Sequence, residues 1–115
     1  MNKYIYQLQI VCLDKEQRDR ISDLLKAKPT KQMGNTWCLE IEEKENDDYF
    51  DFINHFLGLL NDKYEQLEIA RITKEDISIW LLYAYNDQCN IEFSPNDLKR
   101  LGESGIRFCI SCWQS

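Results

Sequence analysis

The last third of the chain constrains the fold most, because its pattern predicts one β-hairpin followed directly by a capped helix. Two runs rich in β-forming residues, Ile77 to Tyr85 and Gln88 to Phe93, are separated only by the dipeptide Asn86-Asp87. Both turn residues tolerate positive φ, so the spacing predicts two antiparallel strands joined by a two-residue turn. Ser94-Pro95 then supplies an N-cap hydroxyl and a proline at the first helical position.

The rest of the chain alternates between strand-like and helix-like patterns. Apolar residues recur at every second position in three further segments, which are Tyr4 to Cys12, Thr36 to Glu42 and Ile106 to Trp113. Apolar residues at helical spacing predict helices from Asp14 to a point before Pro29, from Tyr49 to Leu60, from Lys63 to about Arg71 and from Pro95 to Leu101. We read the third helix as separate, and the alternative is a bent continuation of the second.

This order of elements predicts a single α+β domain over residues 1–115. We expect a two-layer sandwich in which helices cover one face of a mainly antiparallel five-stranded sheet. A ferredoxin-like arrangement is the preferred topology. The other face of such a sheet is left open.

The hairpin register predicts which side chains lie on the open face. If Tyr85 pairs with Gln88, then Tyr83 opposes Asn90, and Leu81 opposes Glu92. Trp80, Leu82 and Ala84 would then share the core face with Cys89, Ile91 and Phe93.

The predicted open face and the neighbouring acidic loop, Glu42 to Asp48, supply candidate partner-binding residues. Tyrosine, tryptophan and arginine are enriched where proteins recognise partners, and carboxylates attract basic surfaces. An alternative is that these aromatic residues are simply good β-formers on a half-exposed sheet. The candidates are Tyr83, Tyr85, Asn90, Glu92, Arg107, Trp113, Glu42 and Glu43.

Charge composition limits the classes of partner. Twenty Asp and Glu against fourteen Lys and Arg give a net charge of −6. Neutralising phosphates requires a basic face, so we expect no nucleic-acid partner. An acidic surface suits a basic protein, although acidity also simply keeps a protein soluble.

The sequence also predicts a cytoplasmic protein with no membrane partner. The first residues lack a basic segment followed by an apolar one, and no apolar stretch approaches the ~20 residues that span a bilayer. The five cysteines lie in apolar, strand-like segments, which favours reduced and buried thiols.

No catalytic, metal or cofactor site is predicted. His55 is the only histidine, and we expect it at the surface of a helix. Cys109 and Cys112 have CxxC spacing but lie in a strand-like run, where residues three apart point to opposite faces. If these residues formed a turn in place of a strand, Cys109 and Cys112 would again be candidates for a metal or redox site.

The chain resembles a family of small bacterial proteins known only as a domain of unknown function, number 4279. The likeness rests on the first strand with its capped helix, on Lys28-Pro29-Thr30 with Gly34 and Trp37, and on the closing segment with Leu98, Leu101, Gly105 and the strand Ile106 to Trp113. It covers nearly the whole chain. The resemblance implies a small cytoplasmic α/β sandwich without an assigned activity, permits an immunity-type role, and carries over no catalytic residues.

Two functional hypotheses follow. The first is a non-catalytic protein-binding module, such as an immunity protein that neutralises a basic toxin. The second is a small-ligand-sensing domain or an enzyme with a pocket on the open sheet face, for which Arg107, Tyr83, Glu92 and Trp113 are the candidates. A homodimer joined at a sheet face or edge is compatible with either.

Overall fold

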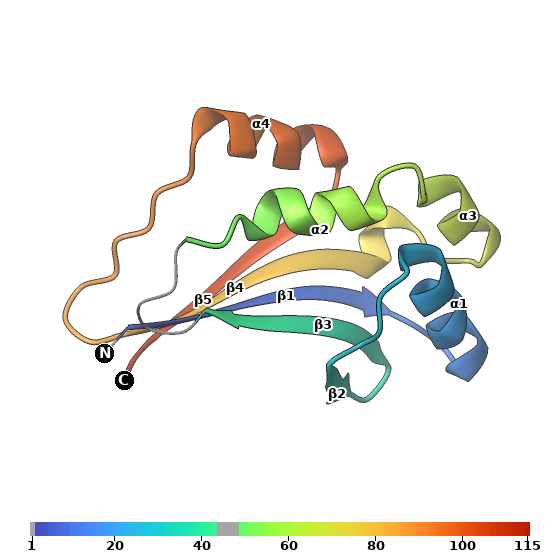
Figure 1. The fold of residues 1–115 in the computed structure, drawn as a ribbon, viewed down its shortest axis with the longest axis horizontal. Helices are drawn as coiled ribbons and strands as arrows, with labels where there is room; N and C mark the ends of the chain where they lie inside the picture. Colours follow the sequence, from blue (N-terminus) through green and yellow to red (C-terminus); the bar gives the residue numbers. More distant parts are fainter. Residues whose placement is uncertain (1, 44–48) are drawn as a thin grey trace.

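The computed structural model describes residues 2–43 and 49–115. Strands and helices alternate along the chain, but the order differs from the expected one, since β2 was not predicted and the strand expected over residues 88–93 does not form (Figure 1). The elements are β1 (Lys3–Val11), α1 (Lys15–Leu25), β2 (Lys31–Met33), β3 (Thr36–Glu43), α2 (Phe52–Leu60), α3 (Tyr64–Ile69), a 3₁₀ turn (Lys74–Asp76), β4 (Ile77–Tyr85), α4 (Pro95–Ser104) and β5 (Arg107–Gln114).

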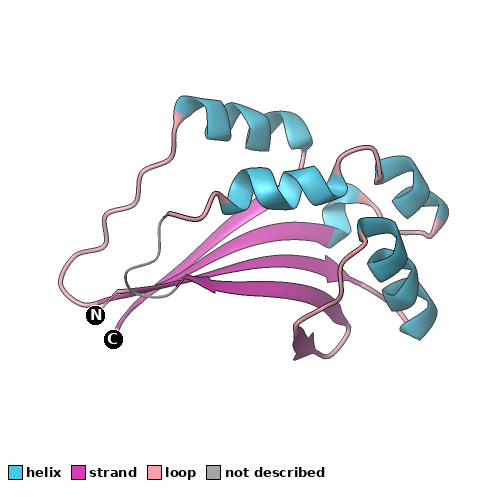
Figure 2. Ribbon diagram, in the orientation of Figure 1, coloured by secondary structure: helices cyan, strands magenta, loops and turns pink. Residues whose placement is uncertain are grey.

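The five strands form one mixed sheet in the order β2-β3-β1-β4-β5. The three pairs β2–β3, β3–β1 and β1–β4 are antiparallel, whereas β4 and β5 are parallel and joined through α4. The helices lie over one face of the sheet (Figure 2). The chain is therefore α+β with a mixed sheet, and the expected mainly antiparallel, ferredoxin-like topology is not confirmed.

The predicted hairpin is wrong. β4 pairs with β1 on one side and with β5 on the other, so neither edge of β4 is available for a strand over residues 88–93. Residues 86–94 instead form an extended connection that leads from the end of β4 to α4 (Figure 2). We call these residues the β4–α4 connection.

The predicted faces of β4 are also inverted. Ile79, Leu81 and Tyr83 are at most 2% exposed and share a face with the buried side chains of β1, whereas Trp80 and Leu82 lie on the other face and are half-buried. Both faces of this strand are apolar, so alternation alone does not distinguish them. The faces were predicted wrongly because they were derived from the register of a hairpin that does not form.

Two N-cap signals are confirmed, whereas α4 ends at Ser104 rather than at the expected Leu101. The Asp14 carboxylate accepts from the Gln17 backbone N–H at 2.9 Å, and the Ser94 hydroxyl accepts from the Asp97 N–H at 3.1 Å. Gly105 ends α4 with φ of 72°, a conformation that glycine adopts without strain. α3 is a separate helix, although its N-cap residue Lys63 makes no side-chain capping bond.

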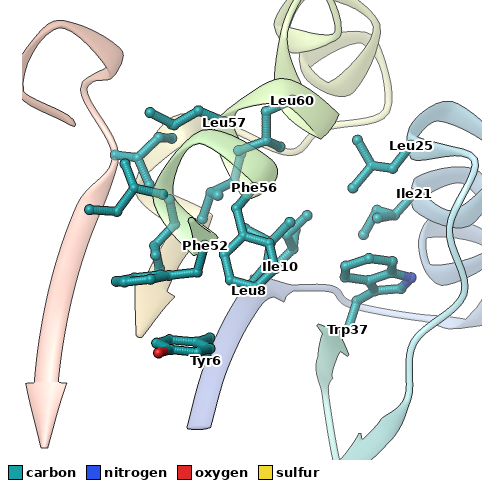
Figure 3. Close-up of a cluster of buried hydrophobic side chains, with 14 of the residues drawn as sticks. Tyr6, Leu8, Ile10, Ile21, Leu25, Trp37, Phe52, Phe56, Leu57 and Leu60 are labelled. Carbon is teal, nitrogen blue, oxygen red and sulfur yellow. The ribbon is translucent and has the colours of Figure 1, made fainter. Parts of the chain in front are cut away.

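The core lies between the sheet and the helices (Figure 3). Phe52 and Phe56 of α2 pack over Tyr6 and Leu8 of β1, and all four are at most 2% exposed. Trp37 of β3 packs beneath α1, where its indole N–H donates to the Ser22 hydroxyl at 2.9 Å. In the described ranges 2–43 and 49–115, no helix has the length and apolar character needed to cross a membrane.

Candidate functional site

The structure brings three of the predicted site residues together. Glu43, Asn90 and Glu92 line one hollow of about 360 Å³ between β1, the end of β3 and the β4–α4 connection. Its volume lies within the range of about 300–1,000 Å³ that is usual for ligand pockets. Its aromatic walls are Tyr4, Tyr6, Tyr49, Phe52 and Phe93, and we call it the tyrosine pocket.

Stacked rings give the tyrosine pocket a rigid wall. The Tyr4 ring stacks on Tyr83 with centroids 4.5 Å apart and planes at 6°, and the Tyr6 ring stacks on Phe52 at 4.4 Å and 16°. Tyr4 and Tyr6 are themselves nearly parallel, at 6.5 Å and 12°. On the connection side, Phe93 meets Phe52 edge-on at 6.5 Å, which anchors this wall to the core.

Glu43 is held in place at the pocket. Its carboxylate accepts a hydrogen bond from the Tyr6 hydroxyl at 2.9 Å and another from the backbone N–H of Phe50 at 2.9 Å. Burial, reinforced by the hydrogen bond and the negative charge of Glu43, raises the pKa of the Tyr6 phenol. A neutral tyrosine therefore donates to a fixed carboxylate at this wall.

Tyr83 lies behind the pocket rather than on the open sheet face. Its hydroxyl donates to the carbonyl oxygen of Gln88 at 3.4 Å, which ties the start of the β4–α4 connection to β4. Hydrogen bonding with the Tyr4 hydroxyl, followed by burial, raises the pKa of Tyr83 to about 12. Tyr85, at the end of the same strand, has its ring centroid 6.1 Å from that of Tyr83.

The remaining predicted residues do not join this site. Glu42 makes an exposed ion pair with Lys3 at 3.3 Å. Arg107 lies opposite Ser78 and Trp113 opposite Ala84 on the other face of the sheet. Arg107 and Trp113 are six positions apart along the strand, or about 20 Å, so they cannot contact one small ligand together.

The open face of the sheet carries a hydrogen-bonded polar row instead of the predicted tyrosines. The side-chain amide of Gln9 donates to Gln7 at 2.6 Å, and that of Gln7 donates to the Glu40 carboxylate at 2.7 Å. Lys31 completes the row through an ion pair with Glu40 at 3.3 Å. These polar groups already pair with one another, so this face is a weaker candidate for a binding site than the tyrosine pocket.

A larger hollow, of about 660 Å³, lies between α1 and the end of α3. It has no aromatic wall, and its carboxylates alternate with Arg20 and Arg71. Asp14 is used as a helix cap, and the Gln17 side chain bridges to the Ala70 carbonyl at 2.8 Å. It is a groove between packed helices, and its mixed charge makes it the weaker candidate.

The tyrosine pocket has the chemistry of a cation site. Aromatic faces attract cations through the ring quadrupole, and carboxylates pair with them. Its walls contain no histidine or cysteine, and His55 is exposed on α2, as predicted. In the part of the chain that the structure describes, no three His, Cys, Asp or Glu side chains are grouped to hold a metal ion.

The aromatic walls were missed from sequence because they come from three separate segments. Tyr4 and Tyr6 share one face of β1, and Tyr49 follows the acidic loop, so each has a sequence signal but nothing joins them. Of that acidic loop, residues 44–48 lie outside the described residues, as does Met1.

Comparisons of the chain with protein-family models, with curated proteins and with solved structures gave no match. The resemblance to domain-of-unknown-function family 4279 therefore stays a prediction.

Proposed function

We propose that this chain is a non-catalytic protein-binding module of the bacterial cytoplasm, and that its tyrosine pocket receives a basic side chain of the partner. One observation carries the proposal. Glu43 and Glu92 line the same hollow as the stacked rings of Tyr4 and Tyr6. Aromatic faces beside carboxylates complement an ammonium or guanidinium group better than any neutral group.

An arginine fits this pocket best. Its planar guanidinium can stack on a tyrosine face while its N–H groups pair with a carboxylate, which an ammonium cannot do as well. Stacking contributes about 0.5–2 kcal/mol, depending on how far the cation loses its water. Glu43 already accepts two hydrogen bonds, but the lone pairs of two carboxylate oxygens can accept more.

The overall charge supports a basic partner. A net charge of −6 attracts a basic protein over several ångströms and speeds its encounter at low salt. The same acidity, together with the family resemblance, supports an immunity-type role in which the module neutralises a basic toxin. The tyrosine pocket would then determine specificity, and the acidic surface would increase the rate of encounter with the toxin.

A small organic cation is the second candidate for the same pocket. The volume of about 360 Å³ suits a metabolite as well as a side chain. This version of the ligand-sensing hypothesis uses the tyrosine pocket, because Tyr83 and Glu92 lie on a different side of the sheet from Arg107 and Trp113.

The proposal is tested with a defined probe. N-acetyl-arginine methylamide is titrated into ¹⁵N-labelled protein, with the citrulline analogue as the uncharged control of the same shape. We expect the amide signals of Tyr4, Glu43 and Asn90 to shift with arginine and not with citrulline. Glu92→Gln should weaken binding several-fold, whereas Glu75→Gln, an exposed carboxylate in the 3₁₀ turn, should not.

Equal shifts with arginine and citrulline, or shifts confined to α1 and α3, would remove the proposed site. Affinity capture from bacterial cells at low and high salt then separates the two candidates. A basic protein released by salt and lost with Glu92→Gln supports the binding module. Capture that Glu92→Gln leaves unchanged refutes the role of the pocket in it.

A further inference from the structure

Two cysteines from separate segments meet at the surface beside the tyrosine pocket. The Sγ atoms of Cys89, on the β4–α4 connection, and Cys112, on β5, are 3.3 Å apart, and both residues are exposed. Cys12 and Cys38 are buried, and Cys109 is half-buried. The expectation of buried thiols is therefore wrong for Cys89 and Cys112. The β4–α4 connection begins at the end of the sheet where β5 ends (Figure 1).

Tyr83 of β4 lies next to both of these cysteines in the fold. Cys112 lies beside Tyr83 in the parallel β4–β5 ladder, which fixes its side chain on the helix-covered face. Cys89 directly follows Gln88, whose carbonyl accepts from the Tyr83 hydroxyl. The same tyrosine therefore positions both partners. An S–S bond of about 2.05 Å needs the sulfurs to approach by little more than an ångström.

We propose that Cys89 and Cys112 form a reversible disulfide, with hydrogen peroxide as the oxidant and a low-molecular-weight thiol as the reductant. One thiolate attacks peroxide, the O–O bond breaks, and a sulfenic acid forms with release of hydroxide, which takes up a proton to give water. The second thiolate then attacks that sulfur, the S–S bond forms, and the departing hydroxide becomes a second water. Reduction by two thiols restores both cysteines and leaves the reductant as its disulfide.

The thiolate is the reacting species, so the reaction should respond to pH. Hydrogen bonding between the two thiols raises the pKa of Cys112. Disulfide formation should therefore accelerate as the pH rises from 7 to 9.

The disulfide acts on one wall of the tyrosine pocket. The four residues that follow Cys89, which are Asn90, Ile91, Glu92 and Phe93, all line that pocket. Joining Cys89 to β5 fixes the start of this wall, so oxidation should change the affinity of the pocket for a basic side chain. This second step rests on the proposed function, whereas disulfide formation does not.

Intact-mass analysis tests the first step without any ligand. The full chain is treated with one equivalent of hydrogen peroxide, quenched with an alkylating agent and mapped by proteolysis. We expect a loss of two mass units in protein sampled before alkylation, and two fewer alkyl groups after it than in the untreated chain. The map should contain a linked Cys89–Cys112 peptide that a thiol removes, and Tm should rise by about 10 °C in the oxidised form. Cys89→Ser and Cys112→Ser should each abolish the link, and Cys109→Ser should keep it.

A link through Cys109, disulfide-bonded dimers, or sulfinic acid at Cys89 without any link would overturn the disulfide proposal. The arginine titration is then repeated on the reduced and oxidised forms, where we expect affinities that differ several-fold. Equal affinities refute regulation of the pocket. If the disulfide forms but neither form binds arginine, the proposed function fails while the disulfide stands.

Discussion

Replacing Tyr6 with phenylalanine should destabilise the protein by about 1.5 kcal/mol, a value at the low end of the range for hydrogen bonds to charged groups. The change removes one hydroxyl and keeps the ring that stacks on Phe52 at 4.4 Å. The lost interaction is the 2.9 Å hydrogen bond to the Glu43 carboxylate. The low end applies because Glu43 is only half-buried, so water can replace part of the bond, and the Phe50 N–H remains.

Urea unfolding followed by circular dichroism measures this difference, and Tm should fall by about 6 °C. Tyr49→Phe is the matched control, because it removes a hydroxyl from a tyrosine that is 65% exposed and should change stability by less than about 0.5 kcal/mol. Glu43→Gln and the double variant complete a thermodynamic cycle. We expect a coupling of about 1 kcal/mol between the two side chains.

Additive effects of the two substitutions would refute the reasoning. They would show that Tyr6 and Glu43 stabilise the fold independently and that the carboxylate is not held by the phenol. A loss far above 3 kcal/mol would also contradict it, because the change would then have disturbed the ring stacking rather than a single hydrogen bond.

Three further predictions concern the core, a helix cap and alkaline pH. Phe56→Ala should lower the unfolding free energy in urea by about 3–5 kcal/mol, because the side chain is fully buried. Ile69→Ala, at an 81% exposed position, should lower it by less than about 0.5 kcal/mol, and similar losses for the two variants would contradict the described core. Ser94→Ala should lower the unfolding free energy by about 1 kcal/mol because it removes the N-cap of α4, and Asn96→Ala should not lower it. An equal loss for the two variants would show that the Ser94 cap does not stabilise the helix. The pKa of Tyr83 is near 10 in the unfolded chain and about 12 in the folded protein, so its contribution to stability is intact below pH 10 and is lost as the pH rises to 12. Tyr83→Phe should therefore flatten the fall in unfolding free energy between pH 10 and 12. An unchanged slope would show that Tyr83 does not cause this fall.

Features that depend on neighbouring residues could be predicted from the sequence. The cap at Ser94 needs only a few residues of chain and forms as expected, and the cap at Asp14 and the end of α4 at Gly105 are equally local features. The opposed faces of Cys109 and Cys112 also follow from strand alternation alone, since they lie opposite Trp80 and Tyr83 on β4.

Features that depend on distant pairing could not be predicted. Residues 88–93 and residues 107–114 both have strand-like composition. Neither sequence pattern indicates which of the two segments pairs with β4. The tight-turn signal favoured the nearer run, but a crossover through α4 brings the later run to that edge. The single wrong pairing then moved Tyr83 to the wrong face. Asn90 and Glu92 still share a site with Glu43, but for a different reason.

That reason is a mismatch of lengths between the two layers. β1 and β4 have nine residues each and span about 30 Å, whereas the nine residues of α2 span only about 14 Å. The helix covers the middle of the sheet and leaves the ends of β1 and β4, which carry Tyr4 and Tyr83, to be covered by the extended β4–α4 connection. Tyrosine suits such a place, because its ring packs while its hydroxyl meets polar groups or water. The strand expected over Tyr4 to Cys12 would span about 30 Å and the helix expected over Tyr49 to Leu60 only about 18 Å, so a stretch of sheet left uncovered by the helix could be expected from sequence. Its position at the ends of β1 and β4 depends on the strand order and could not.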